Sequence, residues 1–227
     1  MKKFKIIISA VLIFVLTLPL IRCSKKTYEI KKSLNLKSDD FVVLMIAELN
    51  KNKNQIQLFK AMELLKDKYP NIKVLCAGDG GMMDELKGEI ASMGLDNNVF
   101  MLGFRQDIND LINISDIGIL MSYREGLPRN IMEFIACGRK VIATDIRGCR
   151  DLVCNDSVGS IVKVGDYEAT AKEIEKYYLL GDKKFEISDE IKKYEIGTIN
   201  NELKKIYSEL NDEINLSRGV SFYASEK

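Results

Sequence analysis

Short strand-like runs, rich in apolar and β-branched residues, alternate with segments of helical spacing along most of this chain. The runs lie at residues 41–47, 72–78, 98–103, 116–122, 140–145 and 159–164. Helical spacing occurs at 54–68, from Gly80-Gly81 to near Gly94, at 108–115, after Pro128 and from about Tyr167. The run at 41–47 is continuously apolar and β-branched, which is typical of a strand buried on both faces, and 72–78 is interpreted in the same way. The alternation of such runs with helices over short connections predicts an α/β fold with a doubly wound parallel sheet, which binds ligands at the carboxyl ends of its strands.

Composition excludes several classes of function. Hydrophobic residues make up 46% of the chain and charged residues 30%, which is enough for a folded core. The net charge is +1 and no basic stripe is interleaved with aromatics, so we expect no nucleic-acid partner. The chain has no histidine, which removes Ser-His-Asp and Cys-His catalysis and histidine-ligated metals. Its five cysteines show no zinc-like CxxC pairing and are interpreted as thiols in a reducing compartment.

The amino-terminal segment is the most apolar part of the chain. A basic start precedes residues 6–21, which carry no charge and would form a helix about 24 Å long. That length lies between a signal sequence and a short membrane anchor, and a buried strand is the alternative. Lysine and arginine are denser after this segment than before it, which favours the cytoplasmic side of the membrane. We therefore expect a signal-like or anchor-like segment at 1–24, a charged linker at 25–40, a ligand-binding domain at 41–210 and a flexible tail at 211–227.

Two glycine-containing patterns restrict the type of nucleotide site. "AGDGGMMDE" follows a predicted strand and opens a predicted helix, but Met83 stands where the dinucleotide fingerprint requires its third glycine. The chain also contains no GxxxxGK[ST] sequence. Both observations argue against NAD, FAD and P-loop sites. The glycines themselves are compatible either with a tight turn or with one wall of a ligand cleft.

The segment "SYREGLPRNIMEFIACG" carries two glutamates, Glu125 and Glu133. It follows the predicted strand at 116–122, so the loop before Pro128 lies at the carboxyl end of that strand. Pro128 suits the first position of a helix, and the free N–H groups that follow it would form a cradle for phosphate. The alternative is a plain amphipathic helix, with an Arg129–Glu133 pair that contributes only tenths of a kcal/mol. Spacing alone leaves both interpretations open.

The segment "SYREGLPRNIMEFIACGRKVIATDIRGCRDLV" resembles the C-terminal signature of the retaining group 1 glycosyltransferases of the GT-B fold. In that signature two glutamates eight positions apart are followed by Ala-x-Gly-x-x-Val. "AELNKNKNQ", "AGDGG", "VFMLGFRQDINDLINISDIGIL" and "YEIGTINNELKKIYSEL" resemble the same family in the same order. The resemblance covers about residues 39 to 210 and is strongest to enzymes of capsular and exopolysaccharide synthesis. It implies a single Rossmann-like domain, the C-terminal half of a GT-B fold.

The resemblance also implies a role for individual residues. Lys53 matches the lysine that neutralises the diphosphate of the donor. Glu125 matches the glutamate beside the donor sugar, and Glu133 the glutamate that accepts from the ribose hydroxyls. The loop and helix start that hold the phosphates correspond to Gly126, Leu127, Arg129 and Asn130. The implied substrate is a nucleotide-diphosphate sugar, with a glycan or lipid-linked acceptor and neither metal nor other cofactor.

Two departures from the family pattern affect the expected activity. Glu48 occupies a position, five residues before Lys53, where the family often has arginine. The family's acceptor-binding domain has no counterpart in this sequence, so a separate acceptor-domain protein is an expected partner. The alternative is a truncated, non-catalytic remnant that binds nucleotide sugar or acts as an interaction module. A Rossmann-like oxidoreductase is a third hypothesis, disfavoured by the broken glycine fingerprint.

Overall fold

Six parallel strands form one sheet in the computed structural model, which describes residues 26–181. The strands are β1 (Phe41–Ile46), β2 (Ile72–Ala77), β3 (Val99–Gly103), β4 (Ile117–Leu120), β5 (Lys140–Thr144) and β6 (Gly159–Val162). Their order across the sheet is β3-β2-β1-β4-β5-β6, and every neighbouring pair is parallel. This is the order of a doubly wound sheet, so the predicted fold class is confirmed.

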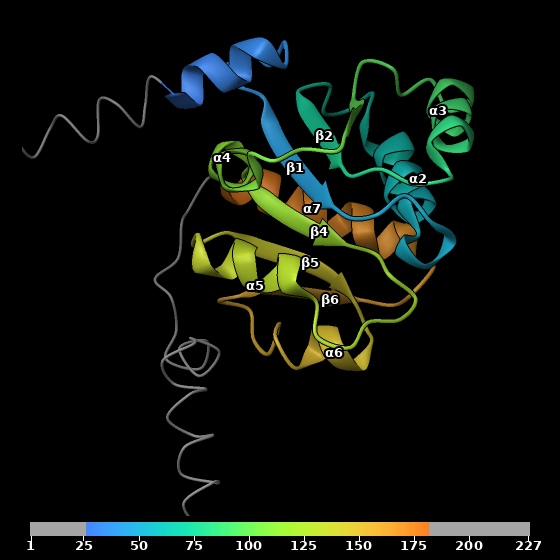
Figure 1. Ribbon diagram of the computed structural model, residues 1–227, viewed down its shortest axis with the longest axis vertical. Helices are drawn as coiled ribbons and strands as arrows, with labels where there is room; N and C mark the ends of the chain where they lie inside the picture. Colours follow the sequence, from blue (N-terminus) through green and yellow to red (C-terminus); the bar gives the residue numbers. More distant parts are fainter. Residues whose placement is uncertain (1–25, 182–227) are drawn as a thin grey trace, which may run out of the picture. The chain divides into compact units, whose positions relative to one another are not determined.

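Helices cover both faces of this sheet. They are α2 (Gln55–Leu65), α3 (Met83–Ser92), α4 (Ile108–Ile114), α5 (Arg129–Ala136), the short α6 (Arg147–Arg150) and α7 (Tyr167–Leu180). Residues of α2, α3 and α7 share one core cluster with the sheet. Helix α5 contacts β4 and β5 and lies in front of the sheet in Figure 1, whereas α7 lies behind it.

The burial of β1 explains why its sequence is an unbroken apolar run. Val43 and Met45 belong to the core cluster that includes residues of α2 and α7. Val42 and Leu44, which alternate with them, are also fully buried. Side chains of a strand alternate between the two faces of the sheet, so β1 is covered on both faces.

Several predicted boundaries concern residues that the structure does not describe. The apolar segment at 1–24, the tail at 211–227 and the predicted domain beyond residue 181 lie outside the described residues. Within the expected linker at 25–40, residues 26–33 are helical and Leu36 is buried. No helix between residues 26 and 181 is both long and apolar enough to cross a membrane.

The glycines after β2 allow close contact between two loops at the carboxyl edge of the sheet. A Cβ on Gly78 would lie 1.9 Å from the carbonyl oxygen of Ala47, and one on Gly80 would lie 2.4 Å from that of Leu49. The Leu49 N–H donates to the carbonyl oxygen of Asp79 over 2.9 Å. Because only glycine permits this approach, the loops after β1 and β2 form one continuous backbone wall.

Candidate functional site

A lysine and a glutamate from two different loops meet beyond the carboxyl ends of β1 and β4. Lys53 ends the short 3₁₀ helix η1 (Lys51–Lys53) after β1, and Glu125 lies in the loop after β4. The Lys53 Nζ is 2.5 Å from the Glu125 Oε1. The strand order reverses between β1 and β4, which is where doubly wound sheets open a ligand crevice. The structure therefore brings the two predicted residues together at the expected position.

Asn52 links these two loops directly. Its backbone carbonyl oxygen accepts from the Tyr123 N–H over 2.8 Å, and its side-chain Nδ2 donates to the carbonyl oxygen of Arg124 over 3.0 Å. Asn50 caps η1 by accepting from the Lys53 N–H over 3.2 Å. These contacts fix the backbone of Lys53 relative to the loop after β4. Asn52 had no predicted role, because its partners lie about seventy residues away in sequence.

Ser122 orients the carboxylate of Glu125 through a hydrogen bond. The Ser122 Oγ donates to the Glu125 Oε1 over 2.7 Å, so this single oxygen accepts from both Ser122 and Lys53. The hydroxyl of Thr144, at the end of β5, donates to the carbonyl oxygen of Ser122 over 2.6 Å. The other carboxylate oxygen, Oε2, has no hydrogen-bond partner among residues 26–181. It remains able to accept from a bound molecule.

The amino terminus of α5 opens onto the same crevice. Pro128 is the N-cap of α5 and not its first helical residue, so the helix begins one residue later than predicted, at Arg129. The backbone N–H groups of Arg129 and Asn130 have no partner in the described part of the chain. The Asn130 side chain is engaged within the protein: its Nδ2 donates to the carbonyl oxygen of Ile46 over 2.7 Å, and its Oδ1 accepts from the Ile131 N–H. Asn130 can therefore offer a ligand its backbone N–H, while its amide joins α5 to β1.

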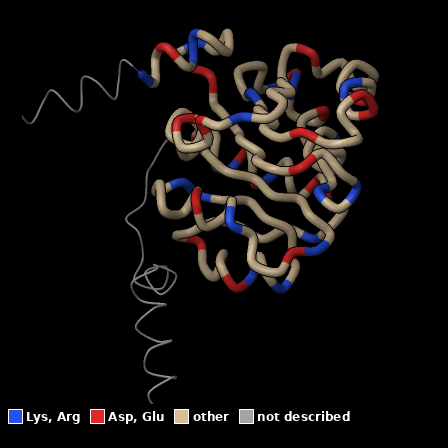
Figure 2. The backbone as a smooth tube through the Cα atoms, in the orientation of Figure 1, with Lys and Arg blue, Asp and Glu red and all other residues tan. Residues whose placement is uncertain are grey.

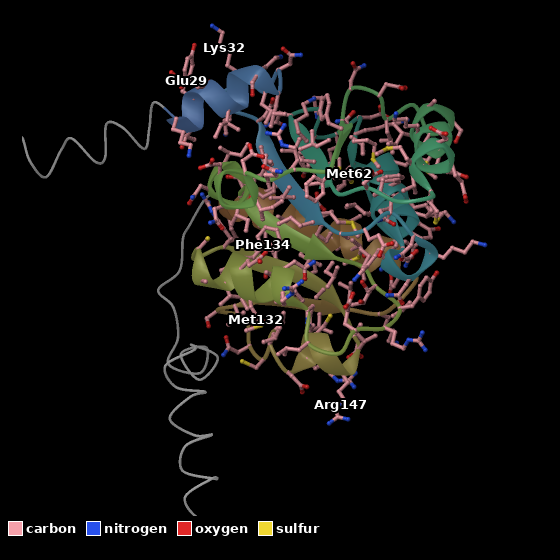
Figure 3. All side chains as sticks on the ribbon, viewed as in Figure 1. Glu29, Lys32, Met62, Met132, Phe134 and Arg147 are labelled. Atoms are coloured by element: carbon pink, nitrogen blue, oxygen red, sulfur yellow. The ribbon has the colours of Figure 1, made fainter. Side chains whose placement is uncertain are left out.

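The two sides of α5 have different environments. Its apolar side, which carries Phe134 (Figure 3), packs onto the sheet. A Cβ on Gly118 of β4 would lie 2.5 Å from the Phe134 ring. Arg129 and Glu133 are exposed on its polar side and form no ion pair with each other. The helix is amphipathic, as one interpretation predicted, but the proposed Arg129–Glu133 pair is not formed. Gly126 and Leu127, in the preceding loop, are also exposed.

A pocket of about 400 Å³ opens beside this crevice at the ends of β1, β2 and β3. It is lined by Ile46, Ala47, Glu48, Ala77, Gly78, Asp79, Phe104, Arg105 and Ile108. Phe104 is 74% exposed. Arg105 donates to both carboxylate oxygens of Asp107, over 2.8 and 2.6 Å, and this contact lowers the pKa of Asp107. Sequence reasoning gave Phe104 and Arg105 no role, although their position just after a predicted strand could have suggested one.

The positive charge at the crevice is local and, within the part of the chain that the structure describes, is not part of a larger basic surface (Figure 2). Acidic and basic residues are interspersed along the described chain in Figure 2. Lys53 and the amino-terminal end of α5, whose aligned peptide dipoles attract anions, both contribute positive potential at the crevice. Burial raises the pKa of the Cys149 thiol to about 12, and the carboxylate of Glu125 adds to the rise. This thiol is protonated at neutral pH and is not a nucleophile. Residues 26–181 contain no cluster of three or more His, Cys, Asp or Glu suited to a metal ion.

Comparison with known proteins gives consistent matches. The family described as "Glycosyl transferases group 1" matches residues 26–195. EpsD of Bacillus subtilis, which is named as a glycosyltransferase, is 38% identical over 149 residues. That match covers 66% of this chain and 39% of EpsD. The Escherichia coli UDP-Gal:alpha-D-GlcNAc-diphosphoundecaprenol alpha-1,3-galactosyltransferase is 30% identical over 142 residues, covering 61% of this chain and 37% of that enzyme.

Solved structures give the same result for the fold. HepE of Anabaena, in complex with UDP, has a TM-score of 0.73 and 26% identity, with 82% of this chain and 53% of HepE covered. A glycosyltransferase from Rickettsia africae has a TM-score of 0.72 and 26% identity, with 82% and 52% covered. The chain thus spans about two fifths of the length of these curated relatives and about half of these solved structures.

Proposed function

This chain belongs to the group 1 glycosyltransferases, and we propose that its crevice between β1 and β4 binds the donor, a nucleotide-diphosphate sugar. The observation that carries the proposal is the meeting of Lys53 and Glu125 beside the open amino terminus of α5. HepE, whose structure contains UDP, matches this fold over 82% of the chain. A cation and a helix amino terminus at one switch point suit a diphosphate, and the adjacent carboxylate suits sugar hydroxyls.

The diphosphate would lie between Lys53 and the first turn of α5. A lysine ammonium has three donors, and Lys53 directs one of them to Glu125, which leaves two for phosphate oxygens. The N–H groups of Arg129 and Asn130 supply further donors at the positive end of the helix dipole. Gly126 and Leu127 form the exposed loop through which the phosphates would reach these donors.

The nucleoside would occupy the pocket and the polar side of α5. Ile46, Ala47 and Ile108 provide apolar walls, and the exposed ring of Phe104 offers a face on which a base can stack. Ile46 also accepts the Asn130 side chain through its carbonyl oxygen, so the pocket and the start of α5 adjoin. Glu133, exposed on α5 and without a partner in the described residues, would accept from the ribose hydroxyls.

The proposed reaction is transfer of a hexosyl group with retention at its anomeric carbon. The bond from that carbon to the diphosphate oxygen breaks, a bond to an acceptor hydroxyl forms, and the acceptor proton is released. Lys53 and the α5 amino terminus would stabilise the charge that develops on the departing diphosphate. Glu125 would hold the sugar through the carboxylate oxygen that Ser122 and Lys53 leave unoccupied. We expect a glycan or lipid-linked acceptor bound by a further domain, on the same or a separate chain.

Calorimetric titration of the chain with UDP tests the donor site directly. We expect saturable binding in the micromolar to millimolar range and a much weaker signal with uridine, because uridine lacks the diphosphate that Lys53 and α5 would hold. GDP and ADP, titrated in parallel, compare the bases. An absence of binding by all three diphosphates at millimolar concentration would exclude the proposed donor site.

Replacement of Glu133 by alanine tests the ribose contact. We expect UDP binding to weaken by about 1–3 kcal/mol, because ribose hydroxyls would lose their charged acceptor. The loss should be smaller for 2′-deoxy-UDP, which lacks one of these hydroxyls. Glu85→Ala, at an exposed glutamate of α3, is the matched control for the change in charge. Equal affinities of Glu133→Ala and Glu85→Ala for UDP would remove Glu133 from the site.

A further inference from the structure

Gly148 lies against the loop that carries Glu125. It follows β5 in the short helix α6 and is buried. A Cβ placed on Gly148 would lie 2.2 Å from the carbonyl oxygen of Gly126 and 2.9 Å from that of Glu125. Both atoms belong to the backbone, so no side-chain rotation relieves the contact. The neighbouring Arg147 projects outward in Figure 3. A Cβ on Gly148 would point at the loop instead.

The same loop is held on two other sides by hydrogen bonds. On the β1 side, Asn52 bonds the backbone of Tyr123 and Arg124. On the β5 side, Thr144 donates to the carbonyl oxygen of Ser122, whose hydroxyl in turn donates to Glu125. At Gly148 the loop backbone occupies the space that a Cβ would need. The hydrogen bonds restrain the backbone at residues 122–124, just before the peptide that Gly148 approaches.

We propose that Gly148 is a positioning residue of the donor site and that its lack of a side chain sets where the Glu125–Gly126 peptide lies. Real Cβ atoms stay at least 3.0 Å from other heavy atoms, so a methyl group on Gly148, at 2.2 Å, requires a displacement of about 0.8 Å. Displacement of this loop moves the carboxylate of Glu125 relative to Lys53 and shifts the entry to α5. Misplacement on this scale is sufficient to weaken binding substantially. The expected effect on UDP binding rests on the proposed donor site, whereas the expected displacement of the loop does not.

Gly148→Ala tests the inference, with Gly81→Ala as its matched control. A Cβ on Gly81 would have nothing within 4 Å, so a methyl group there displaces no neighbour. In Gly148→Ala we expect faster amide hydrogen exchange at Tyr123, whose N–H donates to Asn52, in the free chain, with exchange in β2 and α2 unchanged. We also expect about 10-fold weaker UDP binding. The losses of UDP affinity in Gly148→Ala and Lys53→Ala should be less than additive in the double variant. Displacement of Glu125 matters less once Lys53, its ion-pair partner, has been removed.

The outcomes distinguish failure of the positioning role of Gly148 from failure of the proposed donor site. Hydrogen exchange and UDP affinity in Gly148→Ala that equal those of Gly81→Ala would overturn the positioning role. If the wild type binds no UDP, the proposed donor site is wrong. The role of Gly148 in placing the loop is then tested by hydrogen exchange alone. If Gly148→Ala does not fold, Asn52→Ala and Thr144→Val release the same loop without a steric clash. The inference then requires both variants to show faster local exchange, and wild-type exchange in both would overturn it.

Discussion

Lys53→Ala is expected to weaken UDP binding by about 1.5–3 kcal/mol, or roughly 10- to 150-fold, as measured by calorimetry. The variant loses the side-chain cation closest to the proposed diphosphate position. It also leaves the carboxylate of Glu125, whose side chain is only 14% exposed, without its ion-pair partner. A negative charge beside a bound diphosphate opposes binding, which favours the upper end of the range.

Lys51→Ala is the control for this substitution. Lys51 belongs to the same 3₁₀ helix and is exposed, so its removal changes the net charge equally without touching Glu125. Adding Glu125→Gln to Lys53→Ala should recover part of the lost affinity, because it removes the unpaired negative charge. Equal UDP affinities of Lys51→Ala and Lys53→Ala would mean that Lys53 acts only through long-range charge, and the proposed contact would be wrong.

The sheet was predictable from sequence because its strands are buried on both faces. Burial of this kind requires runs such as 41–47 and 72–78, and all six strands of the structure fall within predicted runs. The helix at 26–33, η1 and the four-residue α6 were not predicted. Such short elements depend on caps and tertiary contacts more than on hydrophobic periodicity. The strand order was likewise not predicted, because alternation alone does not say on which side of β1 each later strand is added.

Individual residues of the site differ in how far their placement could be predicted. Lys53 and Glu125 each follow a predicted strand, and the carboxyl ends of parallel strands lie at one edge of the sheet. The engagement of the Asn130 amide by Ile46 could not be predicted, since it depends on how closely α5 approaches β1. The contact of Gly148 with Gly126 is equally invisible in sequence, because nothing distinguishes this glycine from one that merely begins a turn. The roles of these residues toward a donor stay predictions.

Gln57→Leu is expected to lower the free energy of unfolding by about 2–5 kcal/mol, measured by urea titration. Gln57 is 3% exposed and joins α2 to the turn between β6 and α7. Its Nε2 donates to the carbonyl oxygen of Lys163 over 3.1 Å and to the Thr170 Oγ1 over 3.0 Å. Its Oε1 accepts from the Gly165 N–H over 2.7 Å. Leucine fills a similar volume but forms none of these three hydrogen bonds, each of which contributes about 0.5–1.5 kcal/mol.

Gln106→Leu is the matched control, because it makes the same chemical change at an exposed position and should leave stability nearly unchanged. Thr170→Val should cost less than Gln57→Leu, and the double variant should be less destabilised than the sum, since one hydrogen bond joins the two side chains. Strict additivity would contradict that contact. Wild-type stability of Gln57→Leu would contradict the whole network. Because α2 begins two residues after Lys53, its attachment to the β6–α7 turn also supports the segment on which the donor site depends.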